Sequence, residues 1–470
     1  MPFDSLIAVP LVAHGLAISV EDLPLPLGAF YVGAAAALVL SFALLAAGRR
    51  APAPSASELP PAPRWLQRID SSRVPRRIAA VLALAWLAAT AIIACFGSTE
   101  NAENAAPNLV FVLGWIGLPF ATLLLGRGAL ALHPVAALAR LGGMREETET
   151  APPRRLGVWL AWGGLVVFIW FELVYPTAIH VRLIGGLVLL WTVTGLWAAA
   201  RWGVRPWLES IDPFGTYIRV LASLSPWGPR ADGAVGLRPP LVGPNRDLAA
   251  QPGLVAFVTL LIGTVSFDGL TRTGWWQDRV ALASADLSTH GISAANARIL
   301  FGSTGFVVMV VLVWALFELA AWYAARVGDL DRGPGLRRSA QAFAPSLVPI
   351  ALAYVVAHYF SFFVVQVQDL VRYASDPLGR GHDYFGTAEF TLLDLHVPSG
   401  GAVWLVQVAA IVVGHVAGLL VAHDRALELA PKTADGRPNV RRATLSQLPL
   451  LALMLLYTVG GLYFLSEGLS

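Results

Sequence analysis

The chain has 470 residues, of which 56% are hydrophobic and only 13% are charged, and its net charge is +3. A soluble protein of this length would need far more charged side chains to cover its domains, so the composition excludes the soluble globular class. The single cysteine, Cys95, lies inside an apolar run, which excludes disulfides and thiolate metal clusters within the chain.

Ten apolar segments follow one another along the chain, most of them close to the roughly 20 residues that a helix needs to cross a bilayer. They lie at 25–48, 78–97, 108–126, 156–176, 183–200, 254–270, 299–325, 343–371, 401–423 and 447–466. The predicted fold class is therefore all-α, a polytopic membrane helix bundle of about ten transmembrane helices. We expect residues 1–470 to form a single integral membrane domain in contact with the lipid bilayer.

The segments between these spans alternate in positive charge. Segments 49–77, 126–155, 201–253, 326–341 and 425–446 hold 27 of the 33 Lys and Arg residues, and the opposite set holds six. Because loops rich in Lys and Arg stay in the cytoplasm, this alternation predicts a multi-pass plasma-membrane protein with both termini outside the cytoplasm. The positive charge is thus assigned to topology beside anionic lipid, and nucleic acid is not expected as a partner.

Three segments outside the spans invite specific expectations. Residues 1–13 are apolar like a signal peptide but lack its basic start; cleavage after Ala13 would make His14 the N-terminal residue, with an amine and an imidazole for a metal. Segments 49–77 and 201–253 are expected to be cytoplasmic linkers, the second with a short interfacial helix that is broken at Pro213.

The eighth and ninth spans carry ionisable side chains at helical spacing. In the eighth, His358 and Asp369 lie about 20° apart around a continuous helix, with Tyr354 and Ser361 flanking the same stripe. The ninth contains His415 in a similar polar setting. Because ionisable groups are costly inside a membrane, both stripes are expected to face the bundle, where two neighbouring spans would bring the two histidines close together.

Two histidines at this depth are compatible with three roles. Neutral imidazole is a common ligand of copper, zinc and iron, which makes the pair a candidate site for a transition metal. It could instead hold haem between two helices. The third role is structural, because polar side chains also join helices by hydrogen bonds within bundles.

The predicted outer segment 372–400 is dense in oxygen and nitrogen ligands, which suit zinc or manganese, although the same residue types are common in ordinary solvated loops. Asp268 and His290, in or near the neighbouring outer segment, are natural additional ligands. The side chains of this ligand-rich extracytoplasmic loop are Asp376, His382, Asp383, Glu389, Asp394 and His396. The candidate ligands for a divalent or transition metal ion are therefore His358, His415, Asp369, His382, Asp383, His396 and His14.

Several short motifs, spread over most of the chain, resemble those of a known group of membrane proteins. They are VAHG with DLPLP, APNLVFVLGWIGLP, GTVSFDGL, PSLVPIALAYVVAHYFSFFVVQVQ with ASDPLG, and GHVAGLLVAHDRALEL. In these motifs the chain resembles a group of actinobacterial multi-pass membrane proteins labelled fenitrothion hydrolase, after the membrane-bound organophosphate-degrading enzyme. The resemblance implies hydrolysis of a P–O ester outside the cytoplasmic membrane, with membrane or extracytoplasmic partner subunits. The resemblance does not identify any catalytic residue in this chain.

Hydrolysis of such esters generally uses a metal-activated water, which makes His382 and Asp383 the candidate catalytic residues of a metal-dependent phosphotriester hydrolase. The alternative is a transporter, or a metal- or haem-binding membrane subunit without hydrolase activity. Ten spans divide into five plus five with an inverted second half, as in several transporter folds. No GxSxG elbow, P-loop or HExxH motif occurs in the sequence, which excludes a nucleotide-driven pump within this chain.

Overall fold

The computed structural model of the chain describes residues 26–52, 60–176, 180–230, 234–248, 250–330, 336–390 and 399–467. Among them each predicted span contains an apolar helix, and nine helical stretches are long and apolar enough to cross a membrane. The remaining span, 156–176, contains a shorter helix of 15 residues, Trp159–Leu173. The predicted polytopic helix bundle is therefore confirmed.

The helices in the ten spans are α2 (Leu27–Gly48), α4 (Arg73–Phe96), η5 (Asn108–Gly117) continued by α5 (Leu118–Leu125), α7 (Trp159–Leu173), α8 (Val181–Trp202), α12 (Leu254–Thr271), α14 (Ala294–Gly328), α16 (Val348–Gln366), α18 (Gly400–Leu429) and α20 (Leu448–Glu467). Of these, η5 is a π-helix. The connecting segments hold α3 (Arg64–Ser71), η4 (Asn101–Glu103), η6 (Gly126–Leu132), α6 (Pro134–Leu141), η7 (Arg154–Leu156), α9 (Val204–Ser210), α10 (Pro213–Ala222), α11 (Gly243–Asp247), α13 (Gly274–Thr289), α15 (Leu336–Phe343), η8 (Ala344–Leu347), α17 (Asp369–Ser375) and α19 (Val440–Ser446). In the described residues the only sheet has two antiparallel strands, β1 (Trp227–Pro229) and β2 (Val235–Leu237), with Trp227 opposite Leu237.

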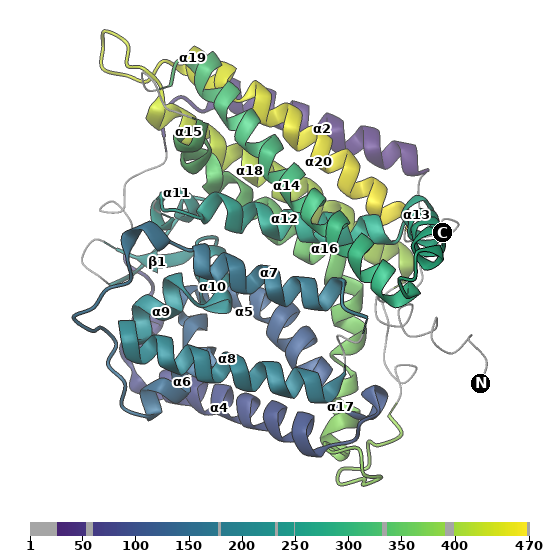
Figure 1. Ribbon diagram of the computed structural model, residues 1–470. Coiled ribbons are helices and arrows are strands. Elements are labelled where there is room, and N and C mark those ends of the chain that lie inside the picture. Colours follow the sequence, from purple (N-terminus) through teal and green to yellow (C-terminus); the bar gives the residue numbers. More distant parts are fainter. Residues whose placement is uncertain are drawn as a thin grey trace.

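The bundle has two groups of helices that lie side by side (Figure 1). One contains α4, η5, α5, α7 and α8, and the other contains α12, α14, α16, α18 and α20. The first span does not stay with its neighbours in sequence, because α2 packs against α18 and α20. Contacts of α7 with α12 and of η5 with α16 join the two groups. The two groups therefore divide after the fifth span, except that α2 joins the helices of the second half of the chain.

Helix α12 lies at the centre of the molecule. Its most apolar stretch is 83% buried within the chain, whereas the corresponding stretches of α4 and α14 are 28% and 17% buried and present most of their surface outward. An all-round apolar helix faces either protein or lipid, so these values separate the core helix from the lipid-facing ones. The approach between α12 and α14 is close because Gly263 has no side chain: a Cβ there would lie 3.1 Å from the Cα of Val310.

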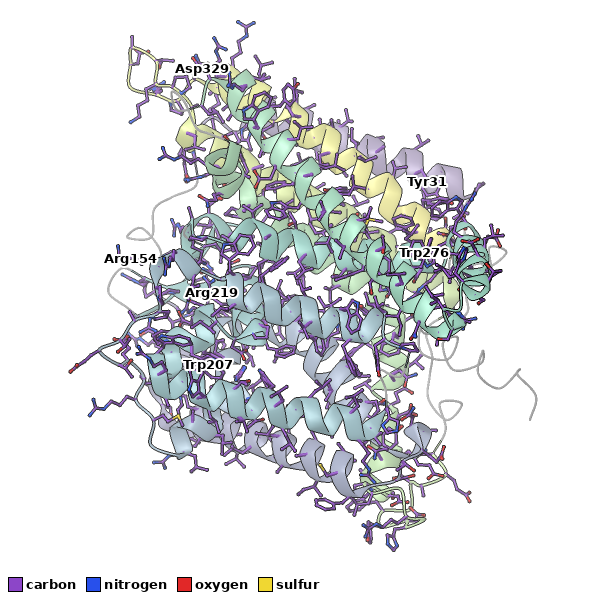
Figure 2. The ribbon with its side chains drawn as sticks, viewed as in Figure 1. Tyr31, Arg154, Trp207, Arg219, Trp276 and Asp329 are labelled. Atoms are coloured by element: carbon purple, nitrogen blue, oxygen red, sulfur yellow. The ribbon has the colours of Figure 1, made fainter. Side chains whose placement is uncertain are left out.

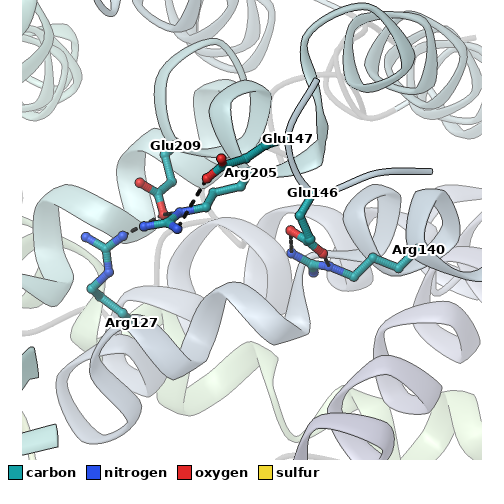
Figure 3. Close-up of polar contacts among 6 residues, drawn as sticks. All are labelled: Arg127, Arg140, Glu146, Glu147, Arg205 and Glu209. Carbon is teal, nitrogen blue, oxygen red and sulfur yellow. Dashed lines mark hydrogen bonds and ion pairs between the residues drawn. The ribbon is translucent and has the colours of Figure 1, made fainter. Parts of the chain in front are cut away.

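Ion pairs connect the segment 126–155 to α9 (Figure 3). A nitrogen of Arg127 lies 2.5 Å from Glu209, and Arg205 lies 3.5 Å from the same carboxylate and 3.6 Å from Glu147. Within the segment, Arg140 pairs with Glu146 at 2.6 Å. Exposed pairs of this kind contribute little stability each, so several of the arginines that set the topology also serve as modest connections between loops.

The segment 201–253 is more ordered than the linker with an interfacial helix that its sequence suggests. Helix α10 begins at Pro213 and is buried from Gly215 to Ala222. In α9, Trp207 is 2% exposed and packs against α6 and α8. The guanidinium of Arg238 is buried, pairs with Asp247 and donates to two backbone carbonyls. The apolar residues of this segment therefore pack against other helices at one end of the bundle.

Segments that the charge pattern places on one side of the membrane lie at one end of the bundle. Figure 2 shows Arg154 and Asp329, both in segments predicted to be cytoplasmic, at the end opposite Trp276, which lies in a predicted outer segment. The alternation of sides is therefore consistent with the arrangement of the helices, and which end faces the cytoplasm remains a prediction from charge.

Cysteine labelling tests this orientation. In a background in which Cys95 is replaced with alanine, Tyr384→Cys and Asp435→Cys place single thiols on two exposed loops. A membrane-impermeant maleimide should label position 384 in intact cells and position 435 only after permeabilisation. Labelling in the reverse order would contradict the predicted topology.

Candidate functional site

A buried acidic and basic cluster joins α12 to α16. The Nε2 atom of His358 lies 2.5 Å from Oδ2 of Asp268, and both side chains are 5% exposed. Arg272, one helical turn after Asp268, places a guanidinium nitrogen 3.2 Å from the same Nε2 and 3.6 Å from the carboxylate oxygen. Because a carboxylate only accepts, Nε2 carries the hydrogen of the short bond, and Arg272 is paired by charge with Asp268. We call Asp268, Arg272 and His358 the Asp–Arg–His cluster.

The second ring nitrogen of His358 is open to a further partner. Among the described residues, Nδ1 of His358 makes no hydrogen bond, since both contacts of the ring use Nε2. A small cavity of about 20 Å³ adjoins the ring and is also lined by Ser266, Tyr354 and Gly461. Most of its lining is apolar, and its volume corresponds to about one water molecule. The imidazole therefore lies between a carboxylate on one side and a water-sized space beside it.

Glu172, near the end of α7, adds a second carboxylate to this region. Its Oε2 atom is buried and has no hydrogen-bond partner. It interacts electrostatically with Asp268, and Tyr359 of α16 interacts with both carboxylates. Ionised carboxylates in apolar surroundings are stable only beside a compensating positive charge or a proton. The cluster and Glu172 thus form one electrostatic unit within the membrane-spanning part of the chain.

His415 has different partners from His358. It is fully buried in α18, its Nδ1 donates to the carbonyl of Ile411 at 2.8 Å, and its Nε2 has no hydrogen-bond partner. The ring of Tyr354 packs edge-on against it at 5.9 Å between centroids. No hydrogen bond joins His358 to His415 within the described part of the chain. A metal ion or haem held by this pair therefore stays a prediction.

Asp369 lies just beyond a two-residue interruption of the helix that carries His358, so the stripe expected for these two side chains over 343–371 stays a prediction. Helix α16 ends at Gln366 and α17 begins at Asp369, and both lie within one helical stretch long enough to cross a membrane, Arg338–Ser375. At the interruption the side-chain amide of Asn108 donates to the carbonyl of Gln366 at 3.0 Å, and that of Gln368 donates to the carbonyl of Val364 at 2.6 Å. Side-chain amides thus bind carbonyls at the end of the helix, where the intrahelical partners run out.

Two carboxylates in the described part of the predicted outer loop, Asp383 and Asp376, accept hydrogen bonds from the loop itself. Asp383 accepts from the hydroxyl of Ser375 at 2.7 Å and from the amide of Ala388 at 3.0 Å. These hydrogen bonds lower the pKa of Asp383 below its usual range. His382 is exposed and stacks on Tyr384 at 5.1 Å between ring centroids. Asp383 therefore stabilises the fold of this loop through its hydrogen bonds to Ser375 and Ala388.

Asp376 has a similar role at the start of this loop. It accepts from the backbone amides of Arg380, Gly381 and His382. Burial raises the pKa of this carboxyl somewhat, but the three amide hydrogen bonds lower it overall, so Asp376 is charged at neutral pH. No group of three or more His, Cys, Asp or Glu side chains suited to a metal occurs among the described residues. His14, Asp394 and His396 lie outside those residues, and the metal candidates remain untested.

The partnership of Asp268 with His358 is the feature that sequence reasoning missed. Asp268 was expected to extend the ligand set of the outer loop, and His358 was paired with His415 or Asp369. One signal was available: Asp268 and Arg272 are four residues apart, which places them on one face of a helix that ends there. The position of α16 beside that face could not be read from spacing.

The resemblance to proteins labelled fenitrothion hydrolase rests on the sequence motifs alone. No family model matches the chain, and neither the curated proteins nor the solved structures include a similar one.

Proposed function

We propose that this chain is a proton-translocating transporter of the plasma membrane, in which the Asp–Arg–His cluster and Glu172 bind the proton that crosses. The observation that carries the proposal is the 2.5 Å contact between His358 and Asp268, buried between two membrane-spanning helices. Ionisable residues at such positions are rare because they are costly, and where they occur they commonly form proton relays.

Charge counting supports a bound proton. If both were ionised, Glu172 and Asp268 would bring two negative charges to the region, and Arg272 brings one positive charge. An apolar environment disfavours the remaining net negative charge, and one proton on His358 or on a carboxylate would remove it. A site that is neutral only when protonated has a physical reason to take up a proton from the membrane surface.

The ring of His358 is suited to pass a proton on. An imidazole can receive a proton on one nitrogen and release a proton from the other, which is the basis of its use as a shuttle. Here Nε2 faces Asp268, and Nδ1 has no hydrogen bond within the described residues. The adjoining cavity of about 20 Å³ gives room for a water molecule as the next carrier.

Metal-dependent hydrolysis of organophosphate esters is the second candidate, and the motif resemblance is what favours it. The described part of the outer loop gives it less support, because Asp383 and Asp376 already accept hydrogen bonds from the loop. Purified protein can be assayed for chelator-sensitive release of nitrophenol from an aryl phosphotriester, with elemental analysis and an absorption spectrum of the same sample. Such release would favour hydrolysis, and a Soret band or bound metal without release would favour a binding subunit.

Proton uptake into proteoliposomes tests the transport proposal. With a potassium diffusion potential, negative inside, and a pH-sensitive dye in the lumen, wild-type protein should acidify the lumen faster than empty liposomes do. Asp268→Asn should slow this acidification at least about tenfold, equivalent to about 1.4 kcal/mol in the barrier. His358→Gln should slow it similarly, since glutamine can still donate to Asp268 but cannot carry a proton through a ring.

Asp286→Asn is the matched control, because Asp286 is an exposed aspartate on the outer helix α13. It should leave the rate of acidification unchanged. Wild-type rates equal to those of empty liposomes would overturn the proposal. Equal rates in wild type and Asp268→Asn would also overturn it, provided that both proteins reconstitute in equal amounts.

A further inference from the structure

A second feature, which shares no residue with the Asp–Arg–His cluster, is a large apolar cavity in the other group of helices. Its volume is about 510 Å³, within the range of about 300–1,000 Å³ that is typical of ligand pockets. Its walls come from α4, η5, α7 and α8, and His133 and Phe214 lie at the end nearer α6 and α10. The cavity therefore lies among membrane-spanning helices.

The few polar groups that line the cavity are already used. Nε2 of His133 donates to Asp212 at 3.0 Å, and its Nδ1 accepts from the amide of Ala136 at 3.2 Å. The indole of Trp191 donates to the other oxygen of Asp212 at 2.8 Å, and the indole of Trp86 donates to the carbonyl of Leu109 at 3.0 Å. These groups therefore have their hydrogen-bond partners within the protein. Within the described residues, the lining contains no Asp, Glu, Lys or Arg side chain that could recognise a polar ligand. The occupant that fits this lining is apolar.

One wall of the cavity reaches the lipid-facing surface. Leu82 of α4 lines the cavity and is 58% exposed, and Trp86 and Leu113 are partly exposed beside it. The lining also includes the π-helix η5, which contributes Val110, Phe111, Leu113 and Gly114. Runs of π-helix are rare and are found mostly where a helix serves a function. An apolar chain in the bilayer can therefore reach the cavity from the side without crossing water.

We infer that this cavity binds one acyl chain of a membrane lipid, which enters sideways past Leu82. The acyl chain would supply the van der Waals contacts that the walls of an empty cavity of this size lack. Packed protein interiors leave few voids larger than a water molecule. The inference is independent of the proposed proton transport, because none of the cavity residues belongs to the Asp–Arg–His cluster.

A photoactivatable 16-carbon fatty acid tests this inference. Purified protein is irradiated with the probe, and the labelled peptides are identified by mass spectrometry. Labelling of the walls, at residues 82–86, 110–118 and 184–191, should saturate and should be displaced by an excess of the unlabelled fatty acid. Val188→Trp, which fills the cavity from α8, should reduce the saturable labelling at least tenfold.

Val193→Trp is the control on the same helix, since Val193 is 65% exposed and does not line the cavity. It should leave the saturable labelling unchanged. If Val188→Trp does not fold, Leu187→Trp fills the same cavity from the next position, and the displacement experiment on wild type needs no variant at all. Labelling that neither saturates nor is displaced, or that is equal in the two tryptophan variants, would show contact with surrounding lipid only and would overturn the inference.

Discussion

Asp212→Ala should lower the free energy of unfolding by about 3–5 kcal/mol. The carboxylate of Asp212 is 2% exposed and accepts from His133 at 3.0 Å, from Trp191 at 2.8 Å and from the amide of Gly215 at 2.8 Å. Alanine would leave three donors without an acceptor in a region closed to water. Each such group costs about 1–3 kcal/mol, and the total is limited by local relaxation.

The measurement is unfolding of purified protein in mixed micelles with increasing denaturing detergent. Asp212→Asn keeps one side-chain oxygen as an acceptor and should be less destabilising than Asp212→Ala. Asp435→Ala, on an exposed loop, is the control and should change stability by no more than about 0.5 kcal/mol. A loss of similar size in Asp212→Ala and Asp435→Ala would show that the bonds to Asp212 contribute little.

Gly414→Leu is the second substitution with a large expected effect, about 3 kcal/mol or more of lost stability. A Cβ at Gly414 would lie 2.2 Å from the Cβ of Ala353 and 3.0 Å from the carbonyl oxygen of Pro349. Helices α16 and α18 would have to separate, because core overpacking is relieved only by moving the backbone. Small residues at such positions are what allow membrane helices to approach closely.

Gly460→Leu is the matched control for this prediction. Gly460 also lies in a membrane-spanning helix, α20, but a Cβ there would meet nothing within 4 Å. The same detergent titration should therefore show wild-type stability for Gly460→Leu and a clear loss for Gly414→Leu. Retention of full stability by both variants would mean that α16 and α18 are packed less closely than described.

The spans were predictable because each satisfies a local condition. A bilayer demands about 20 apolar residues, and the sequence contains ten such segments with arginine on alternate sides. The residues at which the helices begin and end were less predictable. The helix of the eighth span is interrupted after Gln366, whose carbonyl accepts from Asn108, 258 residues earlier, and no periodicity within the span reports on that contact.

The sequence identified individual residues of the candidate site but did not show which of them contact each other. His358 and Asp268 were both recognised as ionisable residues in or near spans, but they are 90 residues apart, and their contact depends on which helices are neighbours. Hydropathy alone also could not separate lipid-facing from buried apolar residues. For that reason an interfacial helix was expected in segment 201–253, whereas Trp207 of that segment is 2% exposed and packs against α6 and α8.

The docking of α2 against the end of the chain has a consequence for biosynthesis. Phe30 packs on Trp404 at 5.6 Å between ring centroids, and the hydroxyl of Tyr31 bonds that of Ser466 at 2.8 Å. Helix α2 therefore completes its contacts only after α20, whose Ser466 lies 435 residues beyond Tyr31, which at about 5–20 residues per second means a wait of roughly 20–90 s. Until α18 and α20 are made, the face of α2 that they cover is exposed to lipid. Its inward face of Phe30, Ala34, Leu38 and Phe42 is apolar and tolerates that wait, because lipid tails solvate such side chains as well as protein does.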